Sequence, residues 1–479
     1  MSSNTIRFIH SEKVVEIRNP DPNETLLNFV RNKLKKTGTK EGCAEGGCGA
    51  CTVVLGELKD NNINYTAVNS CITFLPTLTG KQLILVEDLI SKDNSLHPVQ
   101  EAMVKCHGSQ CGFCTPGFVM SLFSMFKNYS QLKEEIIKDS IAGNLCRCTG
   151  YKPIIKAAKS LRTKNKIDHF VKNKKHTIAL LKKIGNKSIS IYKKDKKYFA
   201  PRYVSELKKI LKKNSNSKLL SGGTDLSLAV TKDRKDIESI VYMNSIEELN
   251  YIKNNNKYIE VGATTSLSSF ETYIKKFYPD FNKILKRYGS VQIRNVATIA
   301  GNIATASPIG DNLPLLLALD SQVVLQGIKK SKILPINNFF INYRKTKLKE
   351  GQFIHSIRIP IFDKNIFKAY KISKRFDDDI SSVCAAFNLL IENKKIKKIK
   401  IAYGGMAEIP KRALSCERVL LNSSITKDVI NKAKNALEKD FLPISDMRAS
   451  GKYRKIIAKN LLEKCFLEIN EKKIIGIYS

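Results

Sequence analysis

Polar and apolar residues alternate near the start of the chain, in the run IRFIHSEKVVEI, and the alternation stops at NPDPN, residues 19–23. Alternation with a period of two predicts strands, and Pro with Asn predicts a break, so we expect a hairpin-like pair of strands. ETLLNFVRNKLKK, residues 24–36, has helical spacing instead. CTVVLGEL and NYTAVNSCIT then have strand patterns. Residues 1–82 are therefore predicted to form a sheet crossed by one helix.

The pattern changes to helical spacing in residues 83–163. Pro98–Cys106 has a helical pattern, and Pro116 suits the first turn of a helix that continues through FVMSLFSMFKN. LKEEIIKDSIAGNLC and YKPIIKAAKSLR supply two further helical patterns. We expect these segments to form a small four-helix bundle.

Residues 164–195 are rich in Lys and hold one short apolar stretch, which predicts a partly ordered linker. A nucleic-acid-binding arm is the alternative, but charge runs are usually solvated faces. In residues 196–362, SELKKILKK predicts a helix, and SKLLSGGTDLSLAV predicts a strand, a turn and a helix. In residues 363–479, KIKKIKIAYGGMAEIPKRA predicts a strand that ends in a Gly-Gly turn.

The composition is that of a folded, multidomain protein. The chain has 479 residues, of which 42% are hydrophobic and 26% are charged, which excludes disorder as the main state. This length corresponds to about two to four domains. No run of ~18 apolar residues is present, so no transmembrane helix is predicted. The N-terminus lacks the apolar core of a secretory signal, and we expect a cytoplasmic location.

The charge balance is strongly basic. Lys and Arg number 82 against 44 Asp and Glu, a formal net charge of +38. The basic residues are spread over the whole length, so a solvated Lys-rich surface is the first interpretation. A docking face for an acidic partner or an anionic cofactor is the second. Duplex DNA comes last, because no helix-turn-helix or zinc-finger spacing is present, and we expect neither a nucleic-acid nor a membrane partner.

Cysteines gather in the first third of the chain, where nine of the twelve lie between residues 43 and 148. Clustered thiols in a long chain without a signal indicate metal rather than a disulfide framework. GCAEGGCGAC followed by Cys71 has the C-x4-C-x2-C…C spacing of a plant-type [2Fe–2S] site. Its glycines allow a loop to wrap a cluster closely. Zinc is the alternative, but structural zinc sites favour paired knuckles. The candidate ligands are Cys43, Cys48, Cys51 and Cys71.

A second set of thiols follows in the helical region. It has the spacing C-x2-C and then C-x-C, and its members are Cys111, Cys114, Cys146 and Cys148. Ligands at the ends of four helices would enclose a second metal centre. Cys106 is interpreted as a core thiol. Cys384, Cys416 and Cys465 are scattered and are interpreted as small buried hydrophobes.

Two Gly-rich segments stand out in the second half, residues 220–225 (LSGGTD) and residues 299–311 (IAGNIATASPIGD). Such turns can place backbone N–H groups against phosphate. An ordinary loop between a strand and a helix is the alternative for the first. Neither segment is a GxGxxG fingerprint and the chain has no Walker motif, so a Rossmann mode of NAD binding is not expected.

GCAEGGCGAC, SQCGFCTPG and NLCRCTGY closely resemble the two-cluster iron–sulfur region of molybdenum hydroxylases, the xanthine dehydrogenase and aldehyde oxidase family. The resemblance covers residues 1 to about 163. It implies a ferredoxin-like β-grasp domain and a helical domain, with one [2Fe–2S] cluster on each set of four cysteines. It also implies that Gln110, just before the second set, contacts a molybdopterin cofactor.

SGGTDL, VQIRNVATIAGNIATASPIGD and FFINYRKTKL resemble the FAD domain of the same family, which has the vanillyl-alcohol-oxidase-like flavin fold. Residues 363–479 resemble its small C-terminal α/β domain, of the CO-dehydrogenase-flavoprotein type. The acidic loop Asp377–Asp379 would lie near the flavin and affect access of the electron acceptor, with a capping turn as the alternative. For Tyr288, a core tyrosine is the alternative to a contact with the flavin ring. The resemblance implies these FAD-binding residues: Leu220, Ser221, Gly222, Gly223, Thr224, Asp225, Tyr288, Ala300, Gly301, Asn302, Thr305, Ser307, Asp311, Ile354 and Lys371.

The resemblance implies an electron-transfer role. No segment after residue 479 remains for a molybdopterin domain, so we expect that centre on a large partner chain, in a dimer of heterodimers. Electrons from oxidation of hypoxanthine or xanthine to urate would pass through two [2Fe–2S] clusters to FAD and then to NAD⁺, as in a xanthine dehydrogenase. No catalytic acid, base or nucleophile is expected in this chain. Another molybdenum hydroxylase, acting on aldehydes or N-heterocycles, is the alternative, and a basic DNA-binding iron–sulfur protein is the third.

Overall fold

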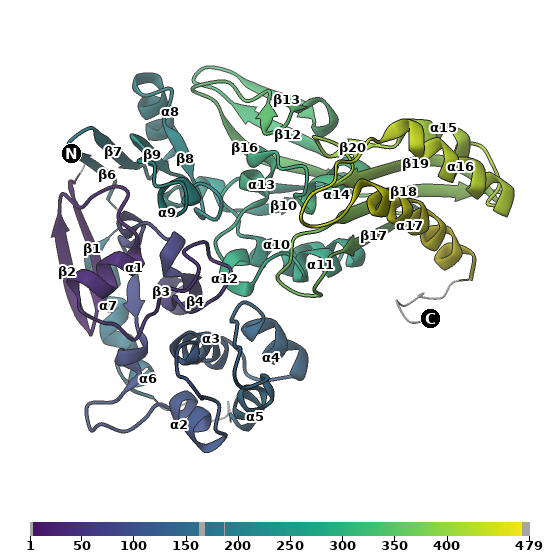
Figure 1. Cartoon of the computed structure of the whole chain (residues 1–479). Coiled ribbons are helices and arrows are strands. Elements are labelled where there is room, and N and C mark those ends of the chain that lie inside the picture. Colours follow the sequence, from purple (N-terminus) through teal and green to yellow (C-terminus); the bar gives the residue numbers. More distant parts are fainter. Residues whose placement is uncertain (1–2, 162–167, 186, 472–479) are drawn as a thin grey trace. The chain divides into compact units, whose positions relative to one another are not determined.

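The computed structural model describes residues 3–161, 168–185 and 187–471. They fall into two compact units. The first comprises Met1–Glu247 with Gly289–Ala297, and the second comprises Glu248–Tyr288 with Thr298–Ser479. Both units combine helices with sheets (Figure 1), which confirms the mixed α and β class predicted from the sequence. In the described ranges, no helix is long and apolar enough to cross a membrane.

The first unit begins with a five-stranded sheet of order β2-β1-β5-β3-β4. β1 and β5 run parallel, and the other neighbours run antiparallel. The predicted hairpin is confirmed, because β1 and β2 pair with Ile6 opposite Ile17. The strands are β1 (Thr5–His10), β2 (Lys13–Arg18), β3 (Thr52–Lys59), β4 (Asn62–Asn69) and β5 (Gln82–Ile84).

The crossing helix is shorter than the predicted 24–36. It begins as α1 (Leu26–Asn28), where the Thr25 hydroxyl accepts the N–H of Asn28 at 3.2 Å, and it continues as one π-helical stretch, Phe29–Lys33. Lys35 has φ +57° and so cannot continue a right-handed helix. Leu26, Phe29 and Val30 of this segment are buried in one core with Ile6 and Phe8 of β1.

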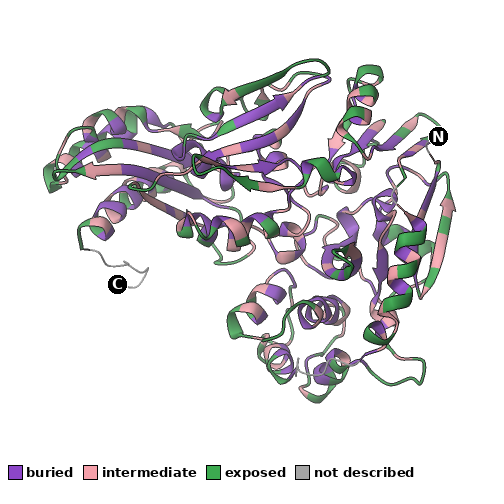
Figure 2. Ribbon diagram, turned by 180° about the vertical axis from the view of Figure 1, so that it is seen from behind, coloured by how far each residue is buried: buried purple, intermediate pink, exposed green. Residues whose placement is uncertain are grey.

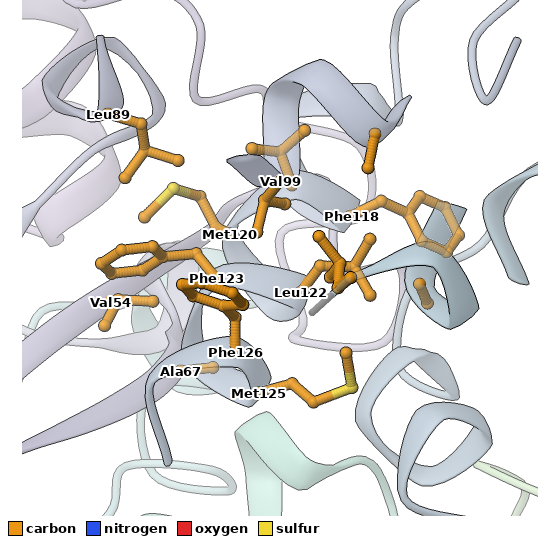
Figure 3. Packing of buried hydrophobic residues seen from close by; sticks show 14 of the residues in the cluster. Val54, Ala67, Leu89, Val99, Phe118, Met120, Leu122, Phe123, Met125 and Phe126 are labelled. Atoms are coloured by element: carbon orange, nitrogen blue, oxygen red, sulfur yellow. The ribbon is translucent and has the colours of Figure 1, made fainter. Parts of the chain in front are cut away.

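Four helices follow, as predicted: α2 (Pro98–Lys105), α3 (Thr115–Asn128), α4 (Glu134–Ile141) and α5 (Lys152–Ser160). α3 is buried from Gly117 to Phe126. Figure 3 shows its side chains packed together with Val54 of β3 and Ala67 of β4. The helical region and the first sheet therefore share one apolar core.

The segment predicted as a linker contains α6 (His169–Lys172) and α7 (Lys174–Ile184). α7 packs Leu181 and Ile184 against Ile9 of β1. Residues 164–167 and 186 of the predicted linker lie outside the described residues. The domain boundaries drawn from the sequence stay predictions.

The rest of the first unit is a small sheet of order β6-β7-β9-β8, with the predicted helix over SELKKILKK. The predicted strand, turn and helix of SKLLSGGTDLSLAV are present as β8 and α9. Segment Gly289–Ala297 adds α12 to this unit. The elements are β6 (Ile189–Lys193), β7 (Lys196–Ala200), α8 (Val204–Lys213), β8 (Lys218–Leu220), α9 (Leu228–Thr231), β9 (Ser239–Tyr242) and α12 (Val291–Arg294).

The second unit contains an antiparallel sheet of order β10-β11-β16-β12-β13 and a separate hairpin, β14-β15. Its strands are β10 (Ile252–Asn254), β11 (Tyr258–Gly262), β12 (Gln322–Gln326), β13 (Ser331–Pro335), β14 (Phe340–Asn342), β15 (Lys345–Thr346) and β16 (Phe353–Pro360). The helices of this part are α10 (Leu267–Ile274), α11 (Pro279–Lys286), α13 (Ile299–Thr305) and α14 (Asn312–Ala318).

The second unit ends in an antiparallel sheet of order β17-β18-β19-β20. The long strands β18 and β19 carry many of the buried positions, shown in purple in Figure 2. β19 ends at Gly404, and Gly405 turns the chain with φ +79°, which confirms the predicted Gly-Gly turn. The elements are β17 (Ile366–Ile372), β18 (Val383–Glu392), β19 (Lys395–Gly404), β20 (Lys411–Arg412), α15 (Leu414–Leu420), α16 (Lys427–Asp440) and α17 (Gly451–Glu471).

Candidate metal centres and nucleotide-binding segments

The first set of cysteines lies beside the first sheet. β3 and β4 pair Thr52 with Asn69, and this register brings Cys51 and Cys71 together with their Sγ atoms 3.3 Å apart. Cys43 is hydrogen-bonded to Cys48 and to Cys71. These contacts lower the pKa of the Cys43 thiol and raise the pKa of the Cys71 thiol. Thiols this close together cannot all lose their protons without a neighbouring positive charge, because the thiolates repel one another. A pair of iron cations would supply that charge.

The loop that carries Cys43, Cys48 and Cys51 is shaped for a close fit. Gly46 and Gly49 have φ of +80° and +69°, in the region that favours glycine. A Cβ on Gly49 would lie 2.2 Å from the carbonyl oxygen of Gly143. The N–H of Glu45 donates to Cys43 Sγ at 3.4 Å, and such bonds stabilise thiolate ligands. The loop therefore fits a [2Fe–2S] cluster.

The second set lies at helix ends in the helical region. Cys111 and Cys114 come just before α3, and Cys146 and Cys148 lie between α4 and α5. The Sγ atoms of Cys148 and Cys111 are 3.6 Å apart, and Cys114 is hydrogen-bonded to Cys146. Burial first, and then the Cys146 hydrogen bond, raise the pKa of Cys114 to about 12. The N–H of Thr149 donates to Cys146 Sγ at 3.5 Å.

The four thiols of the first set thus form a connected chain, whereas those of the second set meet as two pairs. Across the part of the chain that the structure describes, no group of three or more His, Cys, Asp or Glu side chains is arranged to hold a single metal ion. Pairs suit two iron atoms with two thiolates each. Cys106 packs against the helical core instead of joining either set. Cys384, Cys416 and Cys465 are buried.

The two sets differ in exposure. Cys51 and Cys71 are 1% and 2% exposed, whereas Cys111 and Cys148 are exposed, and the other two cysteines of each set are half-buried. Gln110 is exposed beside Cys111. The second set therefore faces solvent at the helical region, and the role predicted for Gln110 stays a prediction.

The first Gly-rich segment follows β8 in the first unit. A Cβ on Gly222 would lie 2.1 Å from the carbonyl oxygen of Val296, and Gly223 has φ +73°. Both glycines are therefore required by the packing of the turn itself. Ser221 Oγ donates to Asn244, Leu220 is buried, and Thr224 and Asp225 are progressively more exposed.

The second Gly-rich segment lies in the second unit, where α13 begins at the Thr298 cap. A Cβ on Gly301 would meet only Thr298 Oγ1 within 4 Å, so this glycine leaves open space that fits an approaching ligand. Asn302 Nδ2 donates to the Tyr288 hydroxyl at 3.1 Å. Of the other predicted positions in this segment, Ala300 is buried, whereas Thr305 and Ser307 are half-buried.

Two residues predicted separately as flavin contacts form an ion pair with each other. Lys371 Nζ on β17 lies 2.6 Å from Asp311 Oδ2, and Ser381 Oγ donates to Asp311 Oδ1 at 2.5 Å. Lys371 also donates to the carbonyl oxygen of Arg287 at 2.9 Å. Ser381 and Arg287 were not predicted as partners from the sequence. The only available signal was strand alternation, which places Lys371 on the inward face with Ala369.

Ile354 and the acidic loop, which were also predicted near the flavin, make contacts typical of a strand and of a turn. Ile354 is buried in β16, opposite Leu325 of β12. In the acidic loop, Asp379 accepts the N–H of Arg375 at 2.8 Å and the N–H of Ile380 at 3.1 Å. Asp379 therefore acts as a turn cap, the alternative given for this loop from its sequence.

Family models match four consecutive parts of the chain. Residues 8–76 match the 2Fe-2S iron-sulfur cluster binding domain, and residues 85–159 match the [2Fe-2S] binding domain. Residues 192–362 match the FAD binding domain in molybdopterin dehydrogenase, and residues 368–469 match the CO dehydrogenase flavoprotein C-terminal domain.

The chain is similar to curated proteins over most of its length. It is 32% identical to a xanthine dehydrogenase of Emericella nidulans, over 95% of this chain and 38% of that protein. It is 34% identical to a xanthine dehydrogenase of Blastobotrys adeninivorans, over 92% of this chain and 39% of that protein. The chain therefore spans well under half the length of these relatives.

Solved structures show a similar fold. A carbon monoxide dehydrogenase from Hydrogenophaga pseudoflava matches with a TM-score of 0.53 at 26% identity, over 56% of this chain and 94% of that chain. Quinoline 2-oxidoreductase from Pseudomonas putida 86 matches with a TM-score of 0.54 at 21% identity, over 58% and 98%, and this likeness concerns the fold alone.

Proposed function

Because the chain belongs to the molybdenum hydroxylase family, as its iron–sulfur and FAD portion, we propose that it carries electrons from a molybdopterin centre on a partner chain to NAD⁺. The observation that carries this proposal is the meeting of eight thiols in two sets of four, of which the second is the more exposed. The exposed set, with Gln110 beside it, is suited to receive electrons from outside the chain.

The bound groups would supply the redox chemistry: iron pairs exchange single electrons, and FAD collects two for hydride transfer. The chain's own residues hold and tune them. N–H groups of Glu45 and Thr149 donate to thiol sulfurs and stabilise negative charge there. Gly301 leaves room for a ligand at α13, and the FAD-binding residues carried over from the family stay proposals.

Metal and flavin analysis of the purified full chain tests the proposal directly. About four iron atoms and one FAD per chain are expected. Replacing Cys148→Ser should abolish one of two paramagnetic resonance signals and leave about two iron atoms. Cys106→Ser is the matched control, because Cys106 packs in the core of the same helices, and it should keep both signals. A colourless full chain, or an unchanged Cys148→Ser spectrum, would contradict the proposal.

For the substrate we propose hypoxanthine and xanthine, oxidised to urate on the partner chain in the cytoplasm. The support is similarity to xanthine dehydrogenases over nearly the whole chain. We propose a dimer of heterodimers for the assembly. Reconstitution with a large molybdopterin-binding chain should give NADH and urate from xanthine, and NADH alone should bleach the flavin of the isolated chain.

A second candidate is the same electron-transfer role in another molybdenum hydroxylase. It is favoured by the structural likeness to an enzyme that acts on carbon monoxide. In the reconstituted complex, turnover of an aldehyde or N-heterocycle without turnover of xanthine would select this candidate. Turnover with oxygen but not NAD⁺ would change the acceptor and leave the electron-transfer role in place.

A further inference from the structure

One short segment joins the two cysteine regions, although it comes from a distant part of the sequence. Residues 289–297 lie inside the match to the FAD binding domain, yet they pack within the first unit. Their helix α12 contacts β4 and α4. Gln292 on α12 is 1% exposed, so its side chain is enclosed by this unit.

The Gln292 amide reaches both cysteine regions. Its Nε2 lies 3.3 Å from Thr52 Oγ1, 3.0 Å from Ser121 Oγ and 3.1 Å from Asn144 Oδ1. Thr52 follows Cys51 of the first set, and Asn144 comes two residues before Cys146 of the second. The contacted side chains are themselves buried.

Asn144 makes the direct link. Its Nδ2 donates to the carbonyl oxygen of Gly49 at 3.0 Å, and its Oδ1 accepts the Ser121 hydroxyl at 2.6 Å. The next residue, Leu145, donates its N–H to the carbonyl oxygen of Cys48 at 3.0 Å. One backbone hydrogen bond therefore connects a candidate ligand of the first set to the residue beside Cys146.

The packing leaves little freedom around this connection. A Cβ on Gly143 would lie 2.2 Å from Ser290 Cβ and 2.5 Å from Gln292 Oε1. Arg294, 1% exposed, holds the end of α12 through a 2.5 Å ion pair with Asp139. The segment is therefore fixed at two places.

We propose that Gln292 and Asn144 are positioning residues that hold the Leu145–Cys48 hydrogen bond and so set the electronic coupling between the two cluster sites. The inference rests on the proposed function. One electron passes from the centre on the second set, which is oxidised, to the centre on the first set, which is reduced. No covalent bond would be made or broken in this transfer.

The test uses the full chain with both clusters and the variant Gln292→Met, which keeps the length of the side chain but removes its amide. We expect about tenfold slower transfer of one electron between the clusters after photochemical reduction, because small misplacements have large kinetic effects. The magnetic splitting between the two reduced clusters should also change, while the g-values of each stay the same. Asn144→Ala should act in the same direction.

A second measurement does not depend on the clusters. Amide hydrogen exchange at Leu145 should accelerate about tenfold in Gln292→Met, because its N–H loses a fixed acceptor. Gln82→Met is the matched control: Gln82 is also buried, at 5% exposure, but lies on β5. It should leave the rate, the splitting and the Leu145 exchange unchanged.

Two results overturn the inference. If Gln292→Met and Asn144→Ala keep both cluster signals and also keep the wild-type rate and splitting, neither residue positions the connection. If Gln82→Met shows the same losses, the effect is general destabilisation. Absence of both cluster signals in the wild-type chain would instead refute the proposed function, and the two failures are thereby distinguished.

Discussion

The side chains of Lys371 and Asp311 are only 1% and 6% exposed, and their charges meet inside the second unit. Removing one member of such a pair leaves an uncompensated buried charge, which costs far more than the pair itself contributes. Ser381 and the Arg287 carbonyl complete the environment. The charged groups of Lys371 and Asp311 already bind protein partners, which limits the hydrogen bonds that either side chain can make to a flavin.

Asp311→Asn should lower the free energy of unfolding by about 3–5 kcal/mol, because Lys371 keeps its charge without a partner. Adding Lys371→Met should restore much of this loss. Urea unfolding followed by circular dichroism measures both variants. Asp320→Asn, which breaks the exposed pair with Lys400, is the control and should cost at most about 1 kcal/mol. Equal effects of the two Asp substitutions would contradict the interpretation.

A buried histidine predicts acid sensitivity of the first unit. Burial lowers the pKa of His97, against the opposing effect of Asp168, whose carboxylate lies 3.1 Å from His97 Nε2. The pKa of Asp168 is about 2, because hydrogen bonding and charge from His97 and Lys127 outweigh its burial. Asp168 therefore loses its contribution only as the pH falls below about 4.

As the pH falls from 6.5 to 5, His97 takes up a proton more readily in the unfolded chain than in the folded one. The free energy of unfolding should therefore decrease over this range, by at most about 2 kcal/mol. His97→Asn should weaken the dependence of the unfolding free energy on pH, because Asn does not titrate. The variant also loses the contact with Asp168. Urea midpoints at several pH values measure the effect. His176→Asn, at an exposed position, should leave the slope unchanged. A steeper slope in His97→Asn would refute the assignment.

At the scale of elements, spacing predicted the two thiol sets and most helices, because ligand spacing and amphipathic periodicity are local signals. The early end of the crossing helix at Lys33 was not predictable, since it depends on the left-handed conformation of Lys35. The joining of α12 to the first unit depends on contacts such as Arg294 with Asp139, far apart in sequence. In α7, the helical signal within a Lys-rich segment was the i, i+4, i+7 spacing of Thr177, Leu181 and Ile184, which the structure buries.

The cysteine loop provides a matched pair of glycines. Gly49→Ala places a Cβ 2.2 Å from a carbonyl oxygen at positive φ and should cost more than about 2 kcal/mol. It should also remove the paramagnetic signal of the first set. Gly47→Ala meets nothing closer than 3.9 Å and should preserve both stability and signal. Iron analysis and thermal unfolding measure the two variants, and a normal Gly49→Ala spectrum would rule out a tightly wrapped loop.

For the whole molecule, the net charge of +38 has a testable effect on assembly. Salt screens charge over about 10 Å at 0.1 M ionic strength, so association with an acidic partner should weaken as salt rises. Between about 0.05 and 0.5 M NaCl, affinity for the proposed large chain should fall at least about tenfold. Isothermal titration measures it, with sucrose at equal osmolality as the control. Affinity independent of salt would indicate an apolar interface.

The apolar core that α3 shares with Val54, Tyr65 and Ala67 of the first sheet limits how the two regions could be exchanged during evolution. If recombination replaced either the helical region or the first sheet with an unrelated domain, apolar side chains of the remaining region would be left exposed to solvent. Hydrogen bonds also hold Tyr65 to α3, because its carbonyl oxygen accepts from the Ser124 hydroxyl and the Asn128 side-chain amide. Separating the helical region from the first sheet would therefore expose apolar surface on both, and the two are expected to be inherited as one folding unit.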